Sequence, residues 1–130
     1  MSNELTGAKV LARMLQDYGV TDIFHVPAVL RTTMAELETI SNVRRIHAHG
    51  EASAAYMADG YARASGKPGV CAAQIIGALN LAAGLRDAWL AKSPVIALTG
   101  GRDQATKFKK AIKKLMIYLH LNQLQSLMQQ

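Results

Sequence analysis

Residues 70–74 form a short run, Val-Cys-Ala-Ala-Gln, in which polar and apolar residues do not alternate. A strand of this kind is buried on both faces, which is typical of a parallel sheet covered by helices on each side. Other short strand-like runs recur along the chain with longer segments between them. We expect strands at 22–26, 43–48, 70–74 and 94–99.

Helices are expected between and before these strands. They should span the stretch from the cap at Thr6 to the left-handed stop at Gly19, then 30–39, 50–64 and 77–92. Apolar residues recur at helical spacing, as at Val10, Leu11, Met14 and Leu15, and again at Leu81, Leu85, Ala88 and Trp89. Strands that alternate with helices imply right-handed crossovers. The sequence therefore predicts a three-layer α/β/α domain with a mainly parallel sheet.

Glu51 stands at the expected start of the helix over 50–64. A carboxylate there lies at the positive end of the helix dipole, and an isolated acid in this position is commonly a structural residue. In a parallel α/β unit, however, the same place is the carboxyl edge of the sheet, where ligands bind. Position alone leaves both interpretations open.

The letters around Glu51 are more specific. The segments HGEASAAYMADGYARASGKPGV (49–70) and GALNLAAGLRDAWLAKSPVIALTG (77–100) closely resemble the N-terminal, pyrimidine-binding domain of thiamine diphosphate enzymes related to acetolactate synthase. The resemblance covers roughly residues 4–111. It implies that thiamine diphosphate is the cofactor and that the intact proteins act on 2-oxo acids.

The resemblance assigns Glu51 as the catalytic carboxylate. In this role it hydrogen-bonds the pyrimidine ring nitrogen and exchanges a proton with the ring, which supports the imino form of the cofactor's aminopyrimidine. The residue before it is Gly50, where relatives often carry histidine. This departure leaves the glutamate chemistry intact but weakens any inference about substrate.

Two further loops should meet Glu51 at this edge. Pro27 and Ala28 occupy the place of a Gly-x-Pro-Gly-like turn, and Gly77 and Asn80 match a small-residue loop that ends in asparagine. The resemblance implies that these four residues contact the cofactor or the substrate. Their structural alternatives are plain, since Gly77 can serve a turn and Asn80 can hydrogen-bond a helix start.

The motif for the cofactor's diphosphate is absent from the 130 residues. Relatives bind diphosphate and magnesium through a separate C-terminal domain with a Gly-Asp-Gly sequence, and their sites join two subunits of a homo-oligomer. By this resemblance the chain holds half of a site and is inactive alone. No metal site is predicted from His25, His47 and His49, because no cysteine or acid completes a ligand set.

The net charge of +6 is not spread over the domain. Residues 1–106 hold ten basic and nine acidic residues, and the remaining positive charges are Lys107, Lys109, Lys110, Lys113 and Lys114. The basic character therefore belongs to the tail and says nothing about the domain's ligand. The partners that we expect include neither nucleic acid nor a membrane. The single Cys71, inside an apolar strand, is typical of a reducing compartment, and the cytoplasm is the expected location.

Residues 112–130 do not resemble the family and form an atypical, amphipathic tail. Synonymous codons from Ala111 onward can encode, in a neighbouring frame, YQEIDDLPAFEPVTKFNAT, which resembles the family's continuation. Our first hypothesis is accordingly a domain over 1–111 truncated by a frameshift. The alternatives are a separate pyrimidine-domain subunit of a two-chain thiamine diphosphate decarboxylase, or a non-catalytic interaction module that uses the tail.

Overall fold

The computed structural model describes residues 5–27, 29–74 and 76–100. Strands and helices alternate along these residues, as the apolar runs predict. The elements are α1 (Gly7–Asp17), β1 (Asp22–His25), α2 (Arg31–Ile40), β2 (Arg44–His47), α3 (Glu51–Ser65), β3 (Gly69–Gln74), α4 (Gly77–Asn80), α5 (Ala82–Leu90) and β4 (Val95–Gly100). The predicted tail, 112–130, and Ala28 lie outside the described residues.

All four strands are parallel and follow the order β2-β1-β3-β4. The chain therefore starts the sheet in its interior, adds β2 on one side of β1, and crosses back through α3 to place β3 on the other side. Register is fixed by pairs such as Ile23 with Val70 and His25 with His47. The expected parallel sheet is confirmed.

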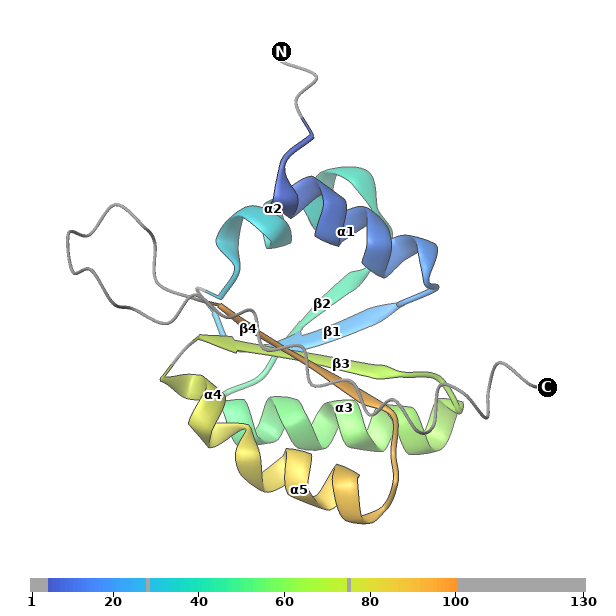
Figure 1. The fold of residues 1–130 in the computed structure, drawn as a ribbon, viewed down its shortest axis with the longest axis vertical. Helices are drawn as coiled ribbons and strands as arrows, with labels where there is room; N and C mark the ends of the chain where they lie inside the picture. Colours follow the sequence, from blue (N-terminus) through green and yellow to red (C-terminus); the bar gives the residue numbers. More distant parts are fainter. Residues whose placement is uncertain (1–4, 28, 75, 101–130) are drawn as a thin grey trace.

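The sheet lies between two helical layers, with α1 and α2 on one face and α3, α4 and α5 on the other (Figure 1). Each face has its own apolar core. The α1–α2 side buries Ala12, Leu15, Ile23, Val29, Met34, Leu37, Val43, Val70, Ala72 and Leu98. The α3–α5 side buries Phe24, Ala48, Ala54, Ala55, Ala58, Ala62, Cys71, Ala73, Leu81, Ala88, Val95 and Ala97. The three-layer α/β/α prediction is confirmed.

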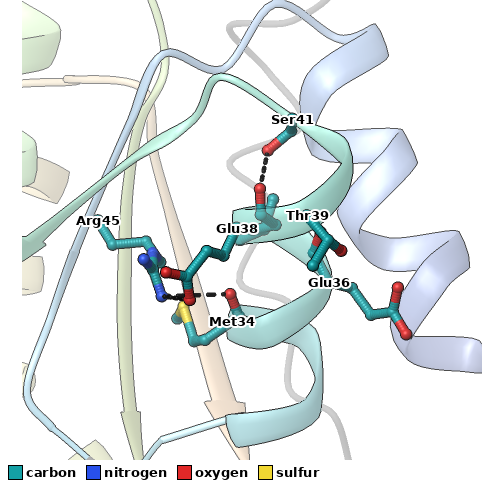
Figure 2. Close-up of polar contacts among 7 residues, drawn as sticks. Met34, Glu36, Glu38, Thr39, Ser41 and Arg45 are labelled. Carbon is teal, nitrogen blue, oxygen red and sulfur yellow. Dashed lines mark hydrogen bonds and ion pairs between the residues drawn. The ribbon is translucent and has the colours of Figure 1, made fainter.

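Polar contacts fix the end of α2 against β2. Arg45 reaches from the strand to the helix, where its Nη1 donates to Glu38 Oε2 at 3.0 Å and lies 3.5 Å from the carbonyl oxygen of Met34 (Figure 2). The Ser41 hydroxyl donates to the carbonyl oxygen of Leu37 at 2.7 Å, which satisfies one of the free carbonyls at the helix end. The Arg45 contacts therefore tie the edge strand β2 to α2.

Some predicted details are wrong. The single helix expected over 77–92 is divided into α4 and α5 at Leu81. Trp89 was expected on the apolar side with Leu81, but it is 63% exposed, whereas Leu81 and Ala88 are buried. In α1, Val10 and Met14 are exposed, since Ala12 and Leu15 face the core. Within the described residues, no helix is long and apolar enough to cross a membrane.

Candidate active site

The strand order creates a switch point between β1 and β3. After β1 the chain turns to α2 on one face of the sheet, and after β3 it turns to α4 and α5 on the other face (Figure 1). Loops that leave neighbouring parallel strands in opposite directions open a crevice at the carboxyl edge of the sheet. The start of α3, which follows β2, lies at this same edge.

Glu51 is the first residue of α3, as predicted. Gly50 precedes it as an extended N-cap residue with φ −165° and ψ 158°, and it has no side chain to cap the helix. Glu51 is the acidic residue of the first turn, so its half-buried carboxylate stands at the positive end of the helix dipole. The carboxylate is thus both favoured electrostatically and accessible.

Two predicted residues of α4 contact the Glu51 side chain directly. The Asn80 amide nitrogen Nδ2 donates to Glu51 Oε2 at 3.2 Å. Gly77 is buried, and a Cβ atom placed on it would overlap Glu51 Oε1 and lie 2.8 Å from Cδ. The structure therefore brings Glu51, Gly77 and Asn80 together, although 29 residues separate the two that share a hydrogen bond.

The two other predicted site residues, Pro27 and Ala28, follow β1 and do not belong to α3 or α4. Pro27 is exposed just beyond the end of β1, in the loop that forms one side of the switch point, and it belongs to a different element from the Glu51 contacts. Ala28 lies outside the described residues. On the α4 side, Ile76 and Leu79 are 83% and 79% exposed and form an apolar rim next to Asn80.

A histidine pair at the same edge was not predicted. His25 and His47 end the neighbouring strands β1 and β2 in register, and their rings meet edge to face with centroids 4.6 Å apart. Burial lowers the pKa of His25, and the positive charges of His47 and Arg45 lower it further, against the raising effect of the Val26 carbonyl oxygen 2.9 Å from Nδ1. The sequence signal was available, because each histidine stands next to last in one of two consecutive predicted strands, 22–26 and 43–48.

Metal ligands do not gather in the described part of the chain: no group of three or more histidine, cysteine, aspartate or glutamate side chains is close enough to hold an ion. The site instead offers the Glu51 carboxylate, which accepts from the Asn80 amide and lies over the bare backbone of Gly77. A planar ring with a basic nitrogen fits this set, because the carboxylate can share a proton with such a nitrogen. The fold and the site define a parallel α/β domain that carries a half-buried glutamate at the carboxyl edge of its sheet.

The comparison with protein families identifies this domain. The family model of the N-terminal TPP-binding domain of thiamine pyrophosphate enzymes matches residues 5–124. The chain belongs to this family. The family expected from the segments around Glu51 and Asn80 is thereby confirmed, and the match continues past the predicted domain boundary at residue 111.

Individual relatives agree with the family. The chain is 41% identical over 96 residues to acetolactate synthase 2, chloroplastic, of Nicotiana tabacum, which covers 72% of the chain and 14% of the relative. It is 39% identical over 97 residues to the probable acetolactate synthase large subunit of Methanocaldococcus jannaschii, a match that covers 74% of this chain and 16% of that relative. It is 34% identical over 105 residues to the probable 2-ketoarginine decarboxylase of Pseudomonas aeruginosa, a match that covers 78% of this chain and 18% of that relative.

A solved structure supports the same assignment. An enzyme from Mycobacterium smegmatis, described as thiamin diphosphate-dependent, superposes with a TM-score of 0.68 at 28% identity, over 80% of this chain and 20% of that one. The chain therefore spans about one fifth or less of the length of these relatives.

Proposed function

We propose that this chain supplies the aminopyrimidine half of a thiamine diphosphate site, with Glu51 as its proton-exchanging carboxylate. The observation that carries the proposal is the contact of Glu51 with Gly77 and Asn80 at the switch-point edge of a domain from this family. The half-buried carboxylate at the start of α3 would accept or return one proton at the pyrimidine ring nitrogen.

Thiamine diphosphate, when bound, supplies a nucleophilic carbon that attacks the carbonyl group of a 2-oxo acid. The domain's own part is to hold the ring, orient it and move one proton at Glu51. The names of the relatives, which include acetolactate synthases and a 2-ketoarginine decarboxylase, favour a 2-oxo acid as substrate. We therefore propose an acetolactate synthase-like activity for the assembled protein.

The other half of the site would come from a diphosphate-binding domain or subunit, which would also hold magnesium. Two features support this. The sequence of the 130 residues has no Gly-Asp-Gly motif. The apolar rim of Ile76 and Leu79 beside the site is exposed, so that another domain or subunit could pack against it. We propose that the complete site forms in a homo-oligomer, in the cytoplasm, and that the chain alone does not turn over 2-oxo acids.

The proposal can be tested on the 130-residue chain itself. Thiamine should bind weakly to the wild-type chain, and the Glu51→Ala variant should lose that binding, as followed by titration calorimetry or NMR shifts. Pyruvate, with thiamine diphosphate and magnesium present, should not be consumed. Equal binding of thiamine to both proteins would remove Glu51 from the site, and turnover by the purified chain would contradict the half-site proposal.

The genetic arrangement is a separate part of the proposal, and the DNA that follows codon 111 distinguishes the options. A neighbouring frame that encodes a family-like continuation would favour the frameshift. An intact gene for a diphosphate-binding protein would favour a two-chain enzyme. If sequencing finds neither, the non-catalytic interaction module becomes the better hypothesis.

A further inference from the structure

The four-residue helix α4 touches both oxygens of one carboxylate. Gly77 and Asn80 are its first and last residues, so they lie one helical turn apart on the same side. Asn80 donates to Glu51 Oε2, while Gly77 faces Oε1. The two contacts act on the same side chain from two points of one rigid turn.

The Gly77 contact limits where the Glu51 side chain can lie. A Cβ atom at Gly77 would come within 2.8 Å of both Cγ and Cδ of Glu51, so any other residue here would displace the carboxylate. The φ of Gly77 does not fall in the left-handed region, since the positive values among the described glycines belong to Gly19 and Gly66. The need for glycine is therefore one of space and not of backbone conformation.

The Asn80 contact does little for stability. Asn80 is exposed, and a hydrogen bond between exposed groups contributes little to folding because water can replace it. Asn80 also does not cap its own helix, because it is the last residue of α4 and its amide reaches across to α3. The bond joins the Asn80 amide to one oxygen of the Glu51 carboxylate.

From these contacts we infer that Asn80 is a positioning residue for Glu51, and that the bare backbone at Gly77 is the second half of the same device. Together they hold the carboxylate in one rotamer before any ligand arrives, which lowers the ordering cost of binding. This inference rests on the proposed function only for the identity of the ligand. The order of the Glu51 side chain is a property of the chain alone.

The first test measures that order without ligand. In the ¹³C-labelled chain, scalar couplings along the Glu51 side chain report whether it occupies one rotamer or averages over several. We expect one rotamer in the wild type and averaging in Asn80→Ala, while Asn42→Ala, an exposed asparagine in the loop before β2, leaves the couplings unchanged. Averaged couplings in the wild type would overturn the inference.

A matched pair of glycine substitutions tests the role of the bare backbone at Gly77. Gly77→Ala should shift the Glu51 signals, whereas Gly60→Ala in α3 should not, because a Cβ at Gly60 has no neighbour within 4 Å. Urea midpoints show whether the variants fold. If Gly77→Ala does not fold, the exposed Asn80→Ala variant still decides the question.

The last test uses thiamine as the probe. Asn80→Ala should weaken thiamine binding by roughly three- to tenfold, the scale of one hydrogen bond, with Asn42→Ala as the control. Unchanged affinity in Asn80→Ala, with binding lost in Glu51→Ala, would overturn the positioning role and leave the proposed function standing. Conversely, altered couplings in Asn80→Ala, with no thiamine binding by the wild type, would contradict the proposed function and leave Glu51 positioning established.

Discussion

A Cβ atom on Gly84 would lie 2.6 Å from the Cβ of Ala55, so α5 and α3 meet at a point where neither can carry a larger residue. The backbone nitrogen of Tyr56 lies 2.8 Å from the same position, and backbone does not move aside easily. Small residues on both helices thus set the distance between them, and α3, which presents Glu51, is held against α5 by this approach.

The first prediction follows from that contact. Gly84→Ala should destabilise the chain by about 1–3 kcal/mol, because the added methyl group overpacks a close helix crossing. Gly60→Ala is the matched control in open space within α3, and it should be neutral or stabilising by up to about 1 kcal/mol. Urea unfolding of both variants measures the difference, and similar effects at the two positions would contradict the packing argument.

The second prediction concerns pH. His25 is buried, so its pKa in the folded chain lies below the unfolded value of about 6.5. As the pH falls through 6.5, His25 therefore takes up a proton in the unfolded state while it stays neutral in the folded state. The contribution of His25 to the free energy of unfolding should be complete above that pH and decline below it. One proton corresponds to a slope of at most about 1.4 kcal/mol per pH unit.

Replacing the imidazole of His25 removes the group that binds this proton in the unfolded state. His25→Phe should flatten the dependence of the unfolding free energy on pH between 5 and 7, as measured by urea unfolding at each pH. His47→Gln should flatten it less, since it removes only a neighbour that lowers the pKa of His25. A slope unchanged in His25→Phe would mean that another group carries the proton.

The third prediction concerns an ion pair on α3. Arg63 donates to both carboxylate oxygens of the buried Asp59, with Nε 3.0 Å from Oδ1 and Nη2 2.6 Å from Oδ2. These hydrogen bonds lower the pKa of Asp59. A lowered carboxyl pKa stabilises the fold above the unfolded value near 3.8, and that stability is lost as the pH falls through the folded value.

Arg63→Gln should therefore reduce stability at pH 7 more than at pH 3, where the carboxylate is closer to protonation. Arg13→Gln, an exposed arginine on α1, serves as the control and should change both midpoints little. The urea midpoints at the two pH values give the answer. Equal losses at pH 7 and pH 3 would show that Arg63 acts by packing and not by charge.

The fourth prediction uses the single cysteine. Cys71 is fully buried in β3, and burial raises the pKa of its thiol to about 12. At pH 8 only about one thiol in ten thousand would be ionised, so a disulfide reagent should not react with the native chain. Labelling should appear in urea in step with unfolding, and rapid labelling in buffer would show that β3 opens locally.

Much of the fold could be predicted because its signals are local. The unbroken apolar run in β3, the stop at Gly19 and the acid that opens α3 each belong to one short segment. What the pattern could not settle was which of several apolar residues face inward. Trp89 and Met14 sit at helical spacing with core residues, yet both are exposed, whereas Ala88 and Ala12 on the same helices are buried.

The candidate site could likewise be predicted only in part. Glu51 at the start of α3 could be placed from the sequence, and Gly77 and Asn80 could be named from the resemblance. Their contact with Glu51 could not, because it depends on α4 packing against α3 across 29 residues of chain. Likewise, the His25–His47 contact requires the in-register pairing of β1 with β2.

The strand order also has a consequence for how the chain is made. β1 is synthesised first, but it occupies the interior of the sheet, and its second partner, β3, leaves the ribosome only after α2, β2 and α3. Until then the edge of β1 that later pairs with β3 has no strand beside it. A nascent chain of this topology passes through an interval in which pairing with other chains competes with folding, so slower translation before residue 74 should increase its aggregation.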